Sequence, residues 1–158
     1  AETSGIRVAM LRTGVVLSPA GGMLQQVLPL FLAGLGGPVA TSGGESHDGS
    51  PWLSWIGADD IAGAFAHAVL DDGVTGPVNA VAPEPVTAKE FATVLGRVLR
   101  RPALIPVPEA GPRLLLGEEG RVETVAADQK VVADRLVSSG YEMRDPELEG
   151  ALRHVLGR

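Results

Sequence analysis

The chain has 158 residues, thirteen basic and nineteen acidic side chains, a net charge of −6 and no cysteine. This length fits one ordinary domain, and the lack of thiols excludes a disulfide framework, a cysteine nucleophile and a cysteine-ligated metal site. Lys and Arg do not cluster, so nucleic acid is not an expected partner. Without a basic-then-apolar leader or an uninterrupted apolar run, we expect a soluble, cytoplasmic protein that does not enter membranes.

The first predicted element is a strand over residues 6–17, IRVAMLRTGVVL. Its nearly unbroken run of β-branched and aliphatic residues is typical of a strand buried on both faces of a parallel sheet. Such a strand needs neighbours, and only five polar or small residues precede it. We therefore expect the elements that flank and cover it to come from elsewhere.

A buried helix is predicted next, over GGMLQQVLPLFLAGLGG, opening near Gly22 and kinked or split at Pro29. A loop rich in glycine and serine follows it. The segment PWLSWIGADD then carries Trp52 and Trp55, which differ by three positions and so face opposite sides of a strand. One of them packs inward, and the other either lines a pocket beside Ser54 or also belongs to the core or an interface.

Three amphipathic helices are predicted where apolar residues recur at i, i+3, i+4, i+7 and i+8. Thr87 and Glu90 have the spacing of a capping box at the start of the second of these helices. We also expect a short strand over residues 77–83, a short helix over 113–116 and another helix over 128–139. The three stripes are Ile61, Ala64, Phe65, Ala68 and Val69; Phe91, Val94, Leu95, Val98 and Leu99; and Leu148, Ala151, Leu152, Val155 and Leu156.

Asp59 and Asp60 stand directly ahead of the first of these stripes, and two interpretations fit them. A carboxylate at a strand end that faces a cleft can act as a general acid or base. An aspartate at this position also accepts hydrogen bonds from the free N–H groups of the first turn and favours the helix dipole, typically worth ~1 kcal/mol. We favour the second interpretation, in which the aspartates start the helix.

Common motifs for phosphate and metal binding do not occur in the sequence. GLGG at residues 34–37 has the opening spacing of a dinucleotide fingerprint, but Val39 occupies the place of the third glycine. His47, His67 and His154 lie in three separate predicted elements, so no metal site is expected.

The order of several segments resembles the C-terminal half of the extended short-chain dehydrogenase/reductases, and within them the nucleoside-diphosphate-sugar-epimerase-like family that ends in a domain of unknown function. The resemblance covers essentially the whole chain. It implies an α/β fold, with late strands of a Rossmann-like parallel sheet plus a mostly helical substrate-binding lobe. Residues 1–100 would supply the strands and elements of the lobe, and residues 101–158 its C-terminal helical segment. The segments that carry the resemblance are RVAMLRTGVVLSPAGGMLQQVLPLFLAGLGGP, WLSWIGADDIA, GPVNAVAPEPVTAKEF and LRRPALIPVP.

The resemblance also implies NAD(P) as the cofactor of the full-length protein, with none held tightly by this chain alone. In relatives, the pattern R-x-x-N-V-Y-G-P passes the nicotinamide end of the cofactor, and residues 12–19 occupy those places here. The implied cofactor-binding residues are therefore Gly14, Val15, Val16 and Leu17, and the candidate substrate-binding residues are Met23, Trp52 and Ser54.

Three departures from the family pattern bear on function. The catalytic Tyr-x-x-x-Lys pair does not occur, because Asp145 stands four residues after Tyr141, the only tyrosine. Gly57 replaces the histidine of H-x-D-D ahead of the helix. Leu53 stands where sugar-nucleotide epimerases carry a diphosphate-binding arginine, so a nucleotide sugar is a doubtful substrate.

Two function hypotheses follow from these observations. In the first, the chain is the substrate-binding part of an NAD(P)-dependent epimerase/dehydrogenase-like oxidoreductase, inactive by itself, and its partners are a small-molecule substrate and the missing N-terminal half or another copy of the chain. In the second, it is a non-catalytic interaction module or a pseudoenzyme that binds a partner chain through an exposed apolar face. The strand at residues 6–17 distinguishes them, since a stand-alone module needs it well folded and an enzyme half leaves it frayed, displaced or paired with another copy.

Overall fold

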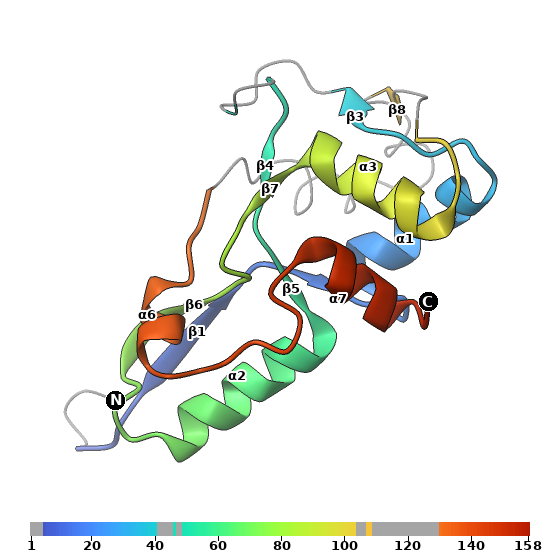
Figure 1. Ribbon diagram of the computed structural model, residues 1–158. Coiled ribbons are helices and arrows are strands. Elements are labelled where there is room, and N and C mark those ends of the chain that lie inside the picture. The colour runs from blue at the N-terminus through green and yellow to red at the C-terminus, as the bar shows by residue number, and fades with distance from the viewer. Residues whose placement is uncertain (1–4, 41–45, 47–48, 104–106, 109–129) are drawn as a thin grey trace.

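A computed structural model describes residues 5–40, 46, 49–103, 107–108 and 130–158 (Figure 1). The short helix predicted at residues 113–116 and His47 lie outside these residues. Among the described strands, three pairs are parallel and one is antiparallel. The strands are β1 (Ala9–Thr13), β2 (Val15–Leu17), β3 (Val39–Ala40), β4 (Trp52–Leu53), β5 (Trp55–Gly57), β6 (Gly76–Ala80), β7 (Val86–Thr87) and β8 (Val107–Pro108); the helices are α1 (Gly22–Leu32), α2 (Ala58–Leu70), α3 (Ala88–Leu99), α6 (Asp134–Ser138) and α7 (Leu148–Val155).

The apolar run at residues 6–17 forms two strands rather than the single strand that the sequence predicts. β1 pairs in parallel with β6, and β2 pairs in parallel with β5. The chain changes partners at Gly14, whose N–H donates to the carbonyl of Ala80 at 3.2 Å, while the N–H of Val15 donates to the carbonyl of Ser54 at 2.8 Å. A Cβ atom at position 14 would stand 2.5 Å from the Ser54 carbonyl oxygen. Only glycine allows the strands to cross this closely.

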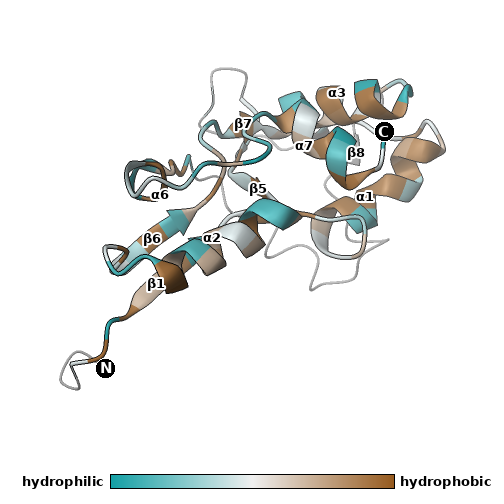
Figure 2. Ribbon diagram, turned by 60° about the horizontal axis from the view of Figure 1, so that its bottom comes forward, coloured by the Kyte–Doolittle hydropathy of each residue, from teal (hydrophilic) through white to brown (hydrophobic). Residues whose placement is uncertain are grey.

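Among the described residues β1 is covered on one face only, so the predicted burial on both faces is not met by this part of the structure. Successive side chains of a strand alternate between faces. Ala9 and Leu11 pack against the core beside α2, whereas Met10 is 53% exposed and Ile6, which precedes the strand, is 71% exposed. Figure 2 shows the hydrophobic character of this strand.

Two hydrophobic clusters hold the described elements together. The larger joins α1, α3 and α7, with Leu24, Leu95 and Leu152 fully buried in it. The smaller lies between α2, β5, β6 and α6 and includes Ile56 and Leu136. In Figure 1 the first group of helices gathers at one end of the molecule, and α2 runs along β1 and β6 at the other. Gly14, where the chain passes from β1 to β2, lies between these two groups of elements.

The predicted helices α1, α2, α3 and α7 are all present. The capping box is confirmed, since Thr87 Oγ1 accepts the N–H of Glu90 at 3.1 Å and the Glu90 carboxylate accepts the N–H of Thr87 at 2.7 Å. Pro29 lies inside α1 without ending it.

Of the described residues in the helix predicted over 128–139, Asp134–Ser138 is helical and residues 130–133 are not. The N–H of Val131 donates to Ser54 Oγ at 3.0 Å, and the carbonyl of Val132 accepts from the Asn79 amide at 3.2 Å. A helix over 128–139 would have needed the carbonyl of Val132, which instead accepts from Asn79, so a tertiary hydrogen bond takes its place here.

Candidate functional site

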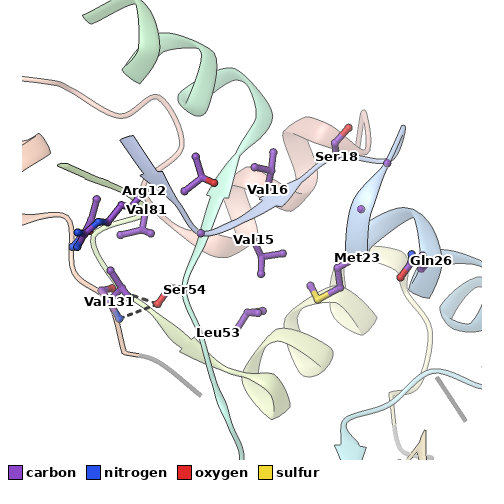
Figure 3. A pocket seen from close by; sticks show the side chains of 15 residues that line it. Arg12, Val15, Val16, Ser18, Met23, Gln26, Leu53, Ser54, Val81 and Val131 are labelled. Carbon is purple, nitrogen blue, oxygen red and sulfur yellow. Dashed lines mark hydrogen bonds between the residues drawn. The ribbon is translucent and has the colours of Figure 1, made fainter. Parts of the chain in front are cut away.

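A cavity of about 800 Å³ lies at the crossing of the chain (Figure 3). It opens beside Gly14, at the carboxyl ends of the parallel strands β1 and β6, and is bounded by β2 and the start of α1. Ligands of open α/β sheets bind at the carboxyl ends of strands. The described residues that line it are Arg12, Thr13, Gly14, Val15, Val16, Ser18, Gly21, Gly22, Met23, Gln26, Leu53, Ser54, Asn79, Val81 and Val131.

The cavity brings together most of the residues expected from the sequence. Gly14, Val15 and Val16 line it, as do Met23 and Ser54. These residues come from three separate stretches of the chain, so the fold gathers them at one place.

Two expected residues lie elsewhere. Leu17 follows the lining residues but is fully buried in the larger hydrophobic cluster. Trp52 does not line the cavity; its ring faces the ammonium of Lys130, with Nζ 4.5 Å from the ring centroid. Its partner Trp55 is the inward one, at 1% exposure, with its indole N–H donating to the carbonyl of Glu84 at 3.2 Å.

Sequence reasoning missed several polar lining residues: Arg12, Ser18, Gln26 and Asn79. Arg12 and Asn79 are opposite each other in the β1–β6 register, and paired residues of neighbouring strands point to the same face. The sequence did contain a signal for this pair: each of two apolar strand segments carries one polar residue near its carboxyl end. Parallel strands bring their carboxyl ends together, so the two residues could have been expected to meet.

One wall of the cavity is formed by Val131, in the C-terminal part of the chain. Ser54 Oγ accepts the N–H of Val131 (dashed in Figure 3), and the Asn79 amide donates to the carbonyl of Val132. The C-terminal part of the chain is thereby attached to both sides of the crossing.

Asp59 and Asp60 are not among the residues that line this cavity, and they hold the C-terminal segment to α2. Asp60 is 2% exposed and accepts the N–H groups of Arg144 at 2.7 Å and Asp145 at 3.2 Å. Asp59 pairs with Arg144 at 3.2 Å and with His154 at 3.3 Å. Asp59 and Asp60 lie in the first turn of α2, as expected, but the expected capping is wrong, because the N-cap is Gly57 and the helix start has no side-chain capping bond. The carboxylate oxygens of Asp60 instead accept hydrogen bonds from the C-terminal segment.

Tyr141 is unsuited to proton transfer. Its hydroxyl donates to the carbonyl of Asp60 at 2.9 Å and lies 3.4 Å from the Asp60 carboxylate. Burial, the negative charge of Asp60 and the hydrogen bond to it raise the pKa of Tyr141 to about 12. A catalytic acid or base works best with a pKa near the working pH, so this tyrosine has a structural role.

The described histidines also take part in structural contacts. His67 Nε2 lies 2.9 Å from Ser139 Oγ, and the His154 ring lies between Asp145 and Asp59. Within the part of the chain that the structure describes, no cluster of three His, Asp or Glu side chains could hold a metal ion. No described helix is long and apolar enough to cross a membrane.

Comparison with known proteins identifies the group to which this architecture belongs. Residues 107–155 match a family described as a domain of unknown function, DUF1731. The chain is 36% identical over 158 residues to the epimerase family protein Mb2239 of Mycobacterium bovis, covering 100% of this chain and 50% of that protein. It is 39% identical over 150 residues to human epimerase family protein SDR39U1, covering 95% of this chain and 48% of that protein. The chain corresponds to the C-terminal part of the epimerase family proteins.

Solved structures agree with this family assignment. The crystal structure of human SDR39U1 (isoform 2) with NADPH matches with a TM-score of 0.80 and 35% identity, over 96% of this chain and 48% of that one. UDP-glucose 4-epimerase of Thermus thermophilus in complex with NAD shares the fold, with a TM-score of 0.66 at 19% identity. The Rossmann-like α/β fold implied by the sequence resemblance is confirmed. This chain spans about half the length of the epimerase family proteins that it matches.

Proposed function

We propose that the chain is the substrate-binding part of an NAD(P)-dependent epimerase- or dehydrogenase-like oxidoreductase, completed by a dinucleotide-binding half. The observation that carries this proposal is the cavity at the carboxyl ends of β1 and β6, lined by residues 14–16. The human relative whose structure is described "with NADPH" supports the same cofactor class.

The cavity suits the nicotinamide end of such a cofactor. Gly21 and Gly22 contribute no side chains to its wall, and Val15, Val16 and Met23 make that wall apolar. A flat, weakly polar ring fits a surface of this kind. Arg12 is the one cation among the described lining residues, so the chain offers few partners for the phosphates of a dinucleotide.

The residues of this chain would bind and orient rather than transfer protons. The backbone of Gly14, Val15 and Val16 would hold the ring, with Leu17 fixing the strand from the core. Met23 and Ser54 would contact the substrate, and Trp52 would support Lys130 beside them. When bound, NAD(P) would supply hydride transfer at a carbinol or carbonyl carbon. In this proposal residues 1–100 provide late strands and elements of the lobe, and residues 101–158 complete the lobe.

A dinucleotide-binding half would also account for the apolar surface of the chain. Met10 is 53% exposed on the uncovered face of β1, and Phe65, Val69 and Leu70 are 51%, 70% and 83% exposed on α2. Parallel sheets are normally covered on both faces. We assign these surfaces to the half that the relatives have in addition.

The alternative is a non-catalytic module or pseudoenzyme that binds another protein through the same apolar surfaces. Both functions use the surfaces, but only the oxidoreductase needs the cavity to contact nicotinamide. The strand at residues 6–17 does not favour the oxidoreductase half, because β1 and β2 pair with β6 and β5 inside this chain, as a stand-alone module needs. Cofactor binding is therefore the measurement that separates the two functions.

The test expresses the 158-residue chain with and without the sequence that precedes it in its gene, and titrates each with NADPH by fluorescence. We expect the longer protein to bind NADPH and the shorter one to bind at least tenfold more weakly. Replacing Val15 with Glu in the longer protein should weaken binding, because the carboxylate would enter the cavity beside the ring. Lys89→Glu, which introduces the same side chain at an exposed position of α3, is the matched control.

Hydride-transfer activity or equally tight NADPH binding by the 158-residue chain would contradict this division of labour. Absence of NADPH and NADH binding by the longer protein would favour the non-catalytic module.

A further inference from the structure

The cavity differs in charge from the chain as a whole. The chain carries a net charge of −6, yet its described lining includes one arginine, Arg12, and no carboxylate. A concave site with one sign of charge attracts ligands of the opposite sign.

The guanidinium of Arg12 is not neutralised within the described structure. Several other arginines bridge two elements and have partners there. Arg7 and Arg135 donate to backbone carbonyls. Arg97 pairs with Glu149, and Arg144 pairs with Asp59. The described part of the chain gives Arg12 no ion pair and no side-chain hydrogen bond, although its side chain reaches the cavity.

The neighbour of Arg12 adds a second point of recognition. Asn79 lies opposite Arg12 on β6 and also lines the cavity. Its amide donates to the carbonyl of Val132 at 3.2 Å, which fixes the side chain and leaves its amide oxygen as an acceptor. A guanidinium fork next to a hydrogen-bond acceptor suits an oxyanion next to a hydroxyl group.

We propose that the cavity binds a small hydroxylated organic anion, whose single carboxylate or phosphate group pairs with Arg12 and whose hydroxyl donates to Asn79. The volume of about 800 Å³ is of the size that small-molecule sites have. A single cation favours one charged group, and Leu53 supplies an apolar wall rather than a second positive charge. The identification of this anion as the substrate rests on the proposed function. The binding of the anion to the cavity does not depend on that function.

The experiment follows the Arg12 Nε–H and Asn79 amide signals of the ¹⁵N-labelled chain by NMR. The probes are glycolate, methyl phosphate, neutral ethylene glycol and ADP. We expect glycolate to shift both signals saturably, methyl phosphate, which has no alcohol hydroxyl, to shift that of Arg12, and ethylene glycol to leave both in place. In Arg12→Gln, binding should weaken roughly tenfold, as for the loss of a charge-assisted pair. Arg101→Gln, which removes the same charge from an exposed turn after α3, should bind like the original chain.

Three results would overturn the proposal: no saturable shift of Arg12 with either small anion, equal binding of ethylene glycol, or full binding by Arg12→Gln. A shift with ADP alone would also overturn it, since Arg12 would then bind a dinucleotide's phosphates. If Arg12→Gln lacks the native amide spectrum, the Arg12 signal of the original chain decides. No cofactor is present, so failure here is separate from failure of NADPH binding in the longer protein.

Discussion

Asp60 is a charged side chain that the fold has placed almost wholly out of water. Burying a carboxylate is costly unless hydrogen bonds replace its hydration. Here the bonds come from the backbone N–H groups of Arg144 and Asp145, with the hydroxyl of Tyr141 beside them. Gly63 leaves room for that hydroxyl, because a Cβ atom there would collide with it. One carboxylate thus holds three residues of the C-terminal segment.

The ionisation of Tyr141 should report this arrangement. It is the only tyrosine, so tyrosinate absorbance near 295 nm follows it alone. We expect a midpoint of about 12 in the folded chain. Asp60→Asn should lower the midpoint towards 10.0 without reaching it, because burial remains. Asp59→Asn, which removes the neighbouring charge but no contact with Tyr141, should leave the midpoint in place.

The same pKa fixes the sign of the dependence of stability on pH. Because folding raises the pKa of Tyr141, its contribution is complete below pH 10 and is lost as the pH rises to about 12. The free energy of unfolding should therefore fall over that interval, and less steeply in Tyr141→Phe. A midpoint near 10 in the folded chain would contradict both expectations.

At the scale of elements, α3 shows how local sequence and tertiary packing agree. Its capping box fixes the first turn, and its apolar stripe places Phe91, Leu95 and Val98 in the larger cluster. The helix ends at Arg100, which adopts the left-handed conformation with φ 55°. Local and long-range preferences therefore select the same residues for this helix.

Thr87→Ala should lower the free energy of unfolding by about 1–2 kcal/mol, since it removes a helix cap at a fully buried position. Thr93→Ala is the matched control on the exposed side of α3, where the hydroxyl only donates to the carbonyl of Lys89. Urea denaturation followed by circular dichroism measures both variants. Equal effects of the two substitutions would show that the cap contributes nothing of its own.

The sequence predicts helices better than it predicts strands in this chain. The stripes of α2, α3 and α7 repeat within a few residues, so local periodicity is sufficient. The division of residues 6–17 depends on the carbonyl of Ser54, forty residues later, and no local pattern contains it. Periodicity also indicated a single apolar face on α2, but Ala64 and Ala68 are buried while Phe65 and Val69 are exposed.

The part of the site that could be predicted consists of residues that are neighbours in the chain and that the family resemblance indicates. Gly14, Val15 and Val16 follow one another, and the resemblance pointed to them. Arg12 and Asn79 meet only through the register of β1 against β6. A register between strands so far apart in sequence is set by tertiary structure, which explains why this pair was not foreseen.

At the scale of the whole molecule, the described structure leaves large apolar side chains in contact with water. Several of them occupy the exposed side of β1 and the outer side of α2, and Figure 2 shows brown ribbon on β1 and at the adjacent end of α2. Large exposed apolar patches usually mark interaction sites. The chain by itself should therefore associate with other copies as its concentration rises.

Sedimentation velocity over a range of concentrations tests this association. We expect the double substitution Phe65→Lys and Val69→Lys to shift the chain towards monomer, because charged side chains oppose burial of this face. Gln25→Lys on α1 and Thr93→Lys on α3 add the same two charges at exposed positions and provide a control that leaves the apolar face intact. Unchanged association of the Phe65 and Val69 double variant would locate the contact elsewhere.

The number of residues between β1 and β2 is important for the lining of the cavity. One residue separates a strand that pairs with β6 from a strand that pairs with β5. Inserting or deleting a residue there would leave the first pairing in frame and turn every later side chain of β2 to the opposite side. Val15 and Val16 would exchange orientation, so the cavity would acquire a different lining although no residue beyond the crossing had been replaced.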